Sequence, residues 1–451
     1  MLPLARGAKV ALLGSACHAG FFDAQWPWDA GDYYMVGGSG AVKSGSDDQW
    51  TILRGLQAGA SAGEIGSLRV EGKDDVDAAI ALMRSPAACD VAIACGGAWS
   101  REGTDRSSLN LDQHQFLVQL GRERTRRVAD GELLPPLIVL ALAPGAITAE
   151  WAADAHAVLV LFSSGQVTGA AAADVLFGRV SPSGRLPVSF PHAQSDTIAP
   201  SRGSVIEYTE GLGVGWKGLI GRQVDYPFGF GLSYSSFSYQ WAGSRPTHAR
   251  PAASLRSITP SEMGGAGPPV RHAGEECWWE CDKTSGSCRS GFCGTAGACC
   301  RHAYGSDDEA SCGQGALGCE DKHCCVLAAG HSRPPPHPPP MSASAAGAET
   351  PALELRINVT NSGAVPAAEV AQLYLAFPPG YAEPALLLRG FAKTAPLAPG
   401  QAQELRFELS DRDLAVWDVT SEEWRRATGR FTATIGRSSR DEHSLSCVFD
   451  A

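Results

Sequence analysis

The first 190 residues alternate short apolar runs with segments whose apolar residues recur at helical spacing. The runs carry no charge and have the length of strands; they lie at residues 10–13, 91–95, 137–143 and 158–162. Between them, Val76, Ile80 and Met83 fall on one helical face, and residues 167–176 are rich in alanine, a strong helix former. Strands that alternate with helices predict an α/β sandwich built on a mostly parallel sheet.

From residue 353 the period of the pattern changes to two. Leu353, Leu355, Ile357 and Val359 alternate with polar residues, and turn residues follow at once. This alternation predicts an all-β, immunoglobulin-like sandwich of about 100 residues. We expect residues 237–241, which lie before the intervening linkers, to add a strand to it.

A cysteine-rich segment with linkers on both sides separates these two regions. Ten of the 14 cysteines lie between Cys277 and Cys325, with almost no aliphatic residues around them. The segment therefore needs covalent cross-links to hold a fold. Five disulfides are the favoured interpretation; zinc is the alternative, although no two Cys-x-x-Cys pairs occur. The predicted divisions are the α/β sandwich at 1–236, a connector and linker at 237–276, the Cys-rich disulfide module at 277–325, a Pro/Ala-rich linker at 326–350 and the β-sandwich at 351–451.

Cysteine usage also indicates a compartment. Disulfide-rich modules persist in oxidising surroundings, so the chain is predicted to be extracellular or in the secretory pathway. No signal peptide is visible at the amino terminus, and we expect the first residues of the natural protein to be missing. The apolar runs fall short of the roughly 20 residues that a membrane helix needs, so no membrane span is expected.

Charge and motif content exclude several classes of function. Lys and Arg number 37 against 48 Asp and Glu, a net charge of −11, so no nucleic-acid partner is expected. The glycine loop at 36–40 lacks the spacing of a dinucleotide or phosphate-binding loop. No Gly-x-Ser-x-Gly elbow marks a serine hydrolase. We predict no cofactor and no metal site.

Ordered sequence blocks run through both predicted domains. They are REGTDRSSL at 101–109, ADVLFG at 173–178, SPSGRLPVSFP at 181–191, PFGFGLSY at 227–234, EVAQLY at 369–374 and LRGF at 388–391. The first four resemble the second domain of glycoside hydrolase family 3, the β-glucosidase and β-xylosidase family. The last two resemble the fibronectin-III-like domain that ends many of its members.

This resemblance implies hydrolysis of terminal β-linked sugars with retention of configuration, in carbohydrate catabolism, on a β-linked oligosaccharide or glycoside. Family members begin with a barrel of about 250 residues that carries the nucleophile, and residues 1–4 here already match the segment after it. We therefore expect a fragment or subunit that is inactive alone, with the barrel on a separate domain or chain. The alternative function is a secreted, non-catalytic carbohydrate-binding or interaction protein.

The resemblance also indicates a catalytic residue. Retaining glycosidases use two carboxyl groups about 5 Å apart, and in this family the second domain supplies the proton donor from the loop after the strand at 91–95. Glu102 is the only carboxylate between Val91 and Thr104, so it is the candidate general acid/base. The alternative is a structural carboxylate that bonds backbone N–H groups at the start of the helix near Leu111.

Three further residues are candidates for substrate binding. Gly38 and Ser39 lie in the glycine loop, where missing side chains would let backbone approach a sugar hydroxyl. Trp99 offers an aromatic face for a pyranose ring, and buried packing is its alternative role. Asp105 and Arg106 are predicted to form a salt bridge that fixes the loop.

Overall fold

The computed structural model describes residues 2–18, 32–41, 49–85, 89–199, 205–252, 255–263, 281–282, 287–288 and 351–451. The chain forms two units, one of residues 1–262 with 351–451 and one of residues 263–350. In the second unit the short strands β10 (Cys281–Asp282) and β11 (Ser287–Cys288) pair antiparallel. The predicted disulfides of the Cys-rich module lie outside the described residues.

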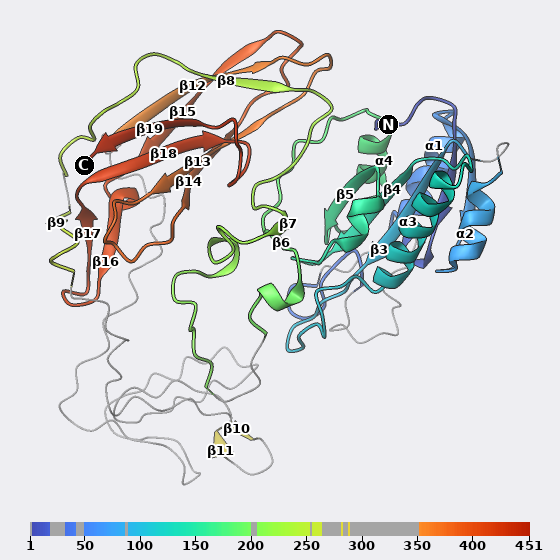
Figure 1. Ribbon diagram of the computed structural model, residues 1–451, viewed down its shortest axis with the longest axis horizontal. Helices are drawn as coiled ribbons and strands as arrows, with labels where there is room; N and C mark the ends of the chain where they lie inside the picture. Colours follow the sequence, from blue (N-terminus) through green and yellow to red (C-terminus); the bar gives the residue numbers. More distant parts are fainter. Residues whose placement is uncertain are drawn as a thin grey trace, which may run out of the picture. The chain divides into compact units, whose positions relative to one another are not determined.

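Five parallel strands form the central sheet of the first unit, in the order β2-β1-β3-β4-β5. Figure 1 labels β3, β4 and β5 of this sheet. The strands are β1 (Ala8–Leu13), β2 (Ile65–Glu71), β3 (Val91–Gly97), β4 (Leu137–Ala143) and β5 (Ala157–Phe162). Every residue of β3 and β4 is buried, as expected for a parallel sheet that is covered on both faces. The α/β sandwich predicted from the apolar runs is confirmed.

Two helices cover each face of this sheet. Leu56 and Leu176 pack over one face, and Ile80, Leu120 and Trp151 pack over the other. Each helix buries one apolar stripe and leaves its polar residues outside. The helices are α1 (Ile52–Ser61) and α4 (Thr168–Leu176) on the first face, and α2 (Val76–Met83) and α3 (His114–Ala129) on the second.

Helices α1 and α4 approach each other through glycines. A Cβ on Gly55 would overlap the carbonyl oxygen of Gly169, and a Cβ on Gly169 would overlap the carbonyl oxygen of Thr51. The amide of Gly169 donates to the carbonyl oxygen of Trp50 over 2.7 Å. Only residues without a side chain permit backbones to come this close.

Residues 181–241 follow the sheet and helix α4, and we call them the connector. This segment differs from the connector and linker predicted at 237–276. Strands β6 (Phe190–Pro191) and β7 (Val224–Tyr226) pair antiparallel within it. Its last strand, β8 (Phe237–Trp241), pairs with β12 (Leu353–Asn361). The prediction that residues 237–241 add a strand to the β-sandwich is therefore confirmed.

The β-sandwich contains a three-stranded sheet, β15-β12-β8, and a four-stranded sheet, β14-β13-β18-β19. Leu353, Leu355, Ile357 and Val359 are all buried, as their alternation predicts. A smaller sheet, β16-β17-β9, completes it. The remaining strands are β13 (Val370–Ala376), β14 (Leu387–Lys393), β15 (Ala402–Leu409), β16 (Ala415–Asp418), β17 (Glu423–Ala427), β18 (Arg430–Gly436) and β19 (Leu445–Asp450).

A strand also forms in the segment that the sequence predicted to be a linker. Strand β9 (Ser257–Ile258) pairs parallel with β17, and the hydroxyl of Tyr381 donates to the carbonyl oxygen of Ile258 over 2.6 Å. Backbone bonds to the sandwich hold this part of the chain, which composition alone could not show. Nearby, the amide of Arg250 donates to the carbonyl oxygen of Ala352 over 2.8 Å, so the segment before β9 is held against the start of β12.

Candidate active site

The predicted site lies at the carboxyl edge of the parallel sheet. From β1 the chain adds β2 on one side, and it then returns to add β3, β4 and β5 on the other. The direction of strand addition therefore reverses between β1 and β3. In open α/β sheets this switch point is where ligand-binding loops diverge.

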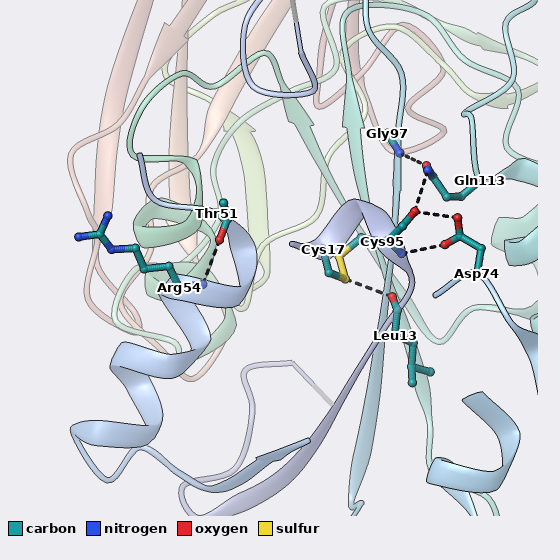
Figure 2. Close-up of a disulfide and its surroundings, with 9 residues drawn as sticks. Leu13, Cys17, Thr51, Arg54, Asp74, Cys95, Gly97 and Gln113 are labelled. Carbon is teal, nitrogen blue, oxygen red and sulfur yellow. Dashed lines mark hydrogen bonds between the residues drawn. A yellow bond between two sulfur atoms is a disulfide. The ribbon is translucent and has the colours of Figure 1, made fainter. Parts of the chain in front are cut away.

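A hydrogen-bonded group of side chains occupies this switch point. The carboxamide oxygen of Gln113 accepts from the amide of Gly97 at 2.9 Å (Figure 2). Its nitrogen donates to the hydroxyls of Ser15 and Tyr33, each at 3.2 Å. The Ser15 hydroxyl in turn donates to Asp74 at 2.7 Å, and the Tyr33 hydroxyl donates to Asp112 at 2.8 Å. We call Ser15, Tyr33, Asp74, Asp112 and Gln113 the switch-point cluster.

Tyr33 has a raised pKa in this cluster. Loss of solvent is the main cause that raises the pKa of Tyr33 to about 12, and the Asp112 carboxylate acts in the same direction. Gln113 is 7% exposed and uses both ends of its carboxamide. The polar groups of the cluster hydrogen-bond to one another. We therefore interpret the cluster as a structural support for the loops at the carboxyl edge of the sheet.

A disulfide lies directly beside this cluster. Cys17, in the short helix η1 (Ser15–Cys17), is bonded to Cys95 of β3, and their Cα atoms are 5.0 Å apart (Figure 2). Both side chains are fully buried. From the sequence, disulfides were predicted only in the Cys-rich module, and this pair was missed. Its signal was available, because each cysteine stands at or just beyond the carboxyl end of a predicted strand.

Above the cluster, residues 32–40 pair with the loop that follows β3. The amide of Gly37 donates to the carbonyl oxygen of Ser100 at 2.8 Å, and the amide of Glu102 donates to the carbonyl oxygen of Gly37 at 3.2 Å. This pairing brings the glycine loop next to the loop that carries Glu102. The sequence predicts a role in the site for each loop on separate grounds.

Glu102 and Ser39 meet at the end of this pairing. One carboxylate oxygen of Glu102 accepts from both the amide of Ser39, at 2.7 Å, and its hydroxyl, at 2.5 Å. These bonds, first the hydroxyl and then the amide, lower the pKa of Glu102. The carboxylate is therefore ionised at neutral pH in this structure.

Gly38 permits the contact between the two loops. Its φ is +96°, a conformation that favours glycine. A Cβ at Gly38 would also overlap the Cβ of Glu102. The glycine that the sequence singled out is required here by backbone conformation and by space.

Trp99 lies in the same loop and is 42% exposed, so it is not buried packing. The guanidinium of Arg101 lies 5.9 Å from the centre of its ring and also donates to the hydroxyl of Thr104 at 3.1 Å. The exposed indole and Glu102 are thus carried on one short loop.

Two interpretations of the loop are corrected by the structure. Arg106 is half-buried and donates to the carbonyl oxygen of Ala146 at 2.6 Å, and among the described residues it forms no salt bridge with Asp105. Glu102 bonds the glycine loop rather than the start of a helix, because α3 begins only at His114.

Among the residues that the structure describes, no three His, Cys, Asp or Glu side chains are grouped so that they could hold a metal ion. The helices in this part of the chain include none with the length and apolar character to cross a membrane.

Known proteins show the same organisation. The chain is similar to "Probable beta-glucosidase F" of Aspergillus fumigatus, 33% identical over 285 residues, which cover 60% of this chain and 30% of the relative. "Probable beta-glucosidase G" of Aspergillus flavus is 25% identical and matches 98% of this chain with 45% of its own length. The chain thus spans less than half the length of these curated relatives.

Solved structures share the fold. The beta-D-glucoside glucohydrolase of Trichoderma reesei matches all of this chain with 52% of its own, at a TM-score of 0.68 and 24% identity. A family 3 beta-glucosidase of Neurospora crassa gives a TM-score of 0.66 at 22% identity, over 99% of this chain and 54% of that one.

Two family models match the chain. The fibronectin type III-like domain matches residues 369–439. The glycosyl hydrolase family 3 C-terminal domain matches residues 1–234, more than half of the chain. The chain therefore belongs to glycosyl hydrolase family 3.

Proposed function

We propose that this chain supplies the acid/base side of an active site that hydrolyses terminal β-linked sugars, above all β-glucosides, with retention. The observation that carries the proposal is the loop pair at the switch point, which holds Glu102 against Ser39 and leaves Trp99 exposed beside it. The names of the relatives, which are β-glucosidases, support the substrate class.

A retaining mechanism needs a second carboxylate about 5 Å away to attack the anomeric carbon. In the part of the chain that the structure describes, the hydrogen bonds of Glu102 are to Ser39 and Gly37, and none is to another carboxyl group. We infer that the nucleophile is supplied by a separate domain or chain, within the length that the relatives carry beyond their match to this one.

An exposed apolar segment supports such a partner. Val205, Ile206, Tyr208, Leu212 and Val214 lie within ten residues of one another, and each is between 46% and 73% exposed. Exposed apolar side chains that form a contiguous surface mark places that a partner covers. We propose that the nucleophile-bearing domain docks on this segment.

Docking would also set the protonation state of Glu102. The carboxylate is now open to solvent and its pKa is lowered, which suits a general base. Cover by a partner domain and a sugar would remove water and raise this pKa, so that Glu102 could hold the proton it must give to the leaving oxygen.

The test uses aryl β-glucosides and aryl β-xylosides. The chain alone should give little or no turnover, and the chain with its barrel partner should give turnover that falls at least about 100-fold in Glu102→Gln. Glu423→Gln, an exposed glutamate in the β-sandwich, is the matched control and should leave the rate unchanged. Robust turnover by the isolated chain, or covalent labelling of one of its carboxylates by a mechanism-based fluorosugar, would contradict the proposal.

The exposed Trp99 also favours a second candidate, a non-catalytic carbohydrate-binding protein that presents this indole to a sugar face. Binding on a glycan array should then survive Glu102→Gln and be lost in Trp99→Ala.

We further propose that the protein is secreted. The disulfide between Cys17 and Cys95 supports this, because such bonds persist in oxidising compartments. Mass spectrometry of the protein purified from its source would detect that disulfide. The fraction from which the protein is purified would show its compartment. Recovery of free thiols at both positions would contradict the assignment.

A further inference from the structure

We propose that Tyr33, Gln113 and the Cys17–Cys95 disulfide are positioning groups that hold the glycine loop and the Glu102 loop in register. Only the role of Glu102 in this statement rests on the proposed function. The positioning itself rests on contacts that link the core of the sheet to the Glu102–Ser39 pair, taken in order from β3 outward.

The first link fixes the end of β3. Cys95 of β3 is bonded to Cys17 of η1, so a disulfide between residues 78 apart in sequence ties the end of β3 to the short helix that follows β1. Two residues later, Gly97 is held on both sides: its amide donates to the Gln113 carboxamide oxygen, and its carbonyl oxygen accepts from the amide of Asp112 at 2.7 Å. The Glu102 loop therefore starts from a fixed point.

The second link fixes the start of the glycine loop. The Tyr33 hydroxyl accepts from Gln113 and donates to Asp112, the same two residues that hold Gly97. The ring of Tyr33 lies against the backbone of Gly97, where a Cβ would approach its ring atoms within 2.5 Å. One tyrosine thus connects the 32–40 segment to the end of β3.

The third link transmits this placement to the carboxylate. From Tyr33 the chain runs to Gly37, which pairs with Ser100 and Glu102 through backbone bonds. Asp32 stiffens the segment because its carboxylate accepts from the amides of Tyr34 and Met35, at 2.6 and 2.8 Å. Between the described residues of the two loops, the pairing at Gly37 and the Ser39 contact are the hydrogen bonds that do not involve Tyr33.

The disulfide restrains η1 because both of its cysteines are buried in the core. Cys17 and Cys95 are both fully buried, and Ser15 of the same short helix is bonded to Gln113 and Asp74 (Figure 2). Loss of the disulfide would free η1, and with it the Ser15 contact that orients the Gln113 carboxamide.

The experiment measures amide hydrogen exchange in peptides that span 32–41 and 97–104, together with the carboxyl titration of Glu102 by ¹³C NMR. The variants are Tyr33→Phe, Gln113→Leu and Cys17→Ala with Cys95→Ala. Tyr381→Phe is the matched control, since its hydroxyl is also buried and bonded, to the carbonyl oxygen of Ile258 and the amide of Thr428. Among the described residues only Ser39 lowers the pKa of Glu102, so that titration reports their contact directly.

We expect exchange in both peptides to accelerate at least about tenfold in Tyr33→Phe, which keeps the ring and so keeps the fold. The pKa of Glu102 should return toward its ordinary value in all three variants and stay unchanged in Tyr381→Phe. Wild-type exchange and titration in Tyr33→Phe and Gln113→Leu would overturn the proposal. Equal changes in Tyr381→Phe would overturn it too, because they would show a loss of overall stability.

These readouts need no substrate, so they are separate from the test of the proposed function. Should Glu102→Gln leave turnover by the assembled enzyme intact, the acid/base role would fail while the positioning result would stand.

Discussion

Arg185 of the connector donates to Glu369 of the β-sandwich over 2.6 Å, with 8% and 1% of their side chains exposed. The second oxygen of Glu369 accepts from the hydroxyl of Tyr239 at 2.7 Å. This carboxylate is thus buried between two donors, one on the segment after the α/β sandwich and one on β8. The contact joins the connector to the β-sandwich.

Arg185→Met should destabilise the protein by about 3–5 kcal/mol, because it leaves a buried carboxylate without its counter-charge. Urea unfolding followed by far-UV circular dichroism measures the loss. Arg430→Met is the matched control: its ion pair with Asp450 is 74% and 51% exposed, and its loss should cost less than about 1 kcal/mol. Equal effects of the two changes would show that the buried pair is not a major source of stability.

Removal of the disulfide, by Cys17→Ala with Cys95→Ala, should lower the free energy of unfolding by about 2–5 kcal/mol, since the bond closes a loop with a sequence separation of 78. Denaturant unfolding under non-reducing conditions checks this. Cys89→Ala, at a buried free cysteine, is the control and should cost about 1 kcal/mol. A double variant as stable as Cys89→Ala would refute the expectation.

Gly55→Ala should destabilise the contact between α1 and α4 by roughly 1–3 kcal/mol, because the new methyl group would overlap the backbone of Gly169. Thermal unfolding is the measurement. Gly145→Ala, where an added Cβ meets nothing within 4 Å, should change stability by less than about 0.5 kcal/mol. A neutral Gly55→Ala would show that the two helices can separate at little cost.

Asp225→Asn should lower the pKa of His192 toward its ordinary value. In the folded protein the hydrogen bond and charge of Asp225 raise this pKa. A raised pKa stabilises the fold below about pH 6.5, the unfolded value, and this contribution is lost as the pH rises through the folded pKa. Titration of the His192 imidazole by NMR measures the shift. An unchanged pKa of His192 in the variant would show that the ion pair with Asp225 does not cause the shift.

The buried strands could be predicted from sequence because β3 and β4 are apolar throughout. Strand β2 was missed, since it lies at the edge of the sheet and buries only Ile65 fully. Helix α1 was missed as well. Its sequence contains Gly55 and Gly59, residues that weaken an isolated helix, and the structure shows that close packing against α4 and Phe177 requires them.

The four candidate site residues were predicted on separate grounds, and the structure places Glu102, Gly38 and Ser39 in contact, with Trp99 in the same loop. Glu102 and Ser39 are 63 residues apart in sequence, so their contact depends on strand order, which local patterns do not encode. The same reason hid Tyr33 and Gln113, whose roles arise only when β1 and β3 become neighbours.

The bond between Arg250 and Ala352 has an evolutionary consequence. The Arg250 bond and strand β9 hold the chain on the β-sandwich before residue 263, and β12 holds it after residue 351, so the cysteine-rich stretch is inserted between two anchored ends. For a flexible graft, each doubling in length would cost only about 0.6 kcal/mol of closure entropy. This site can therefore accept, exchange or discard whole modules while the hydrolase scaffold on either side is inherited intact.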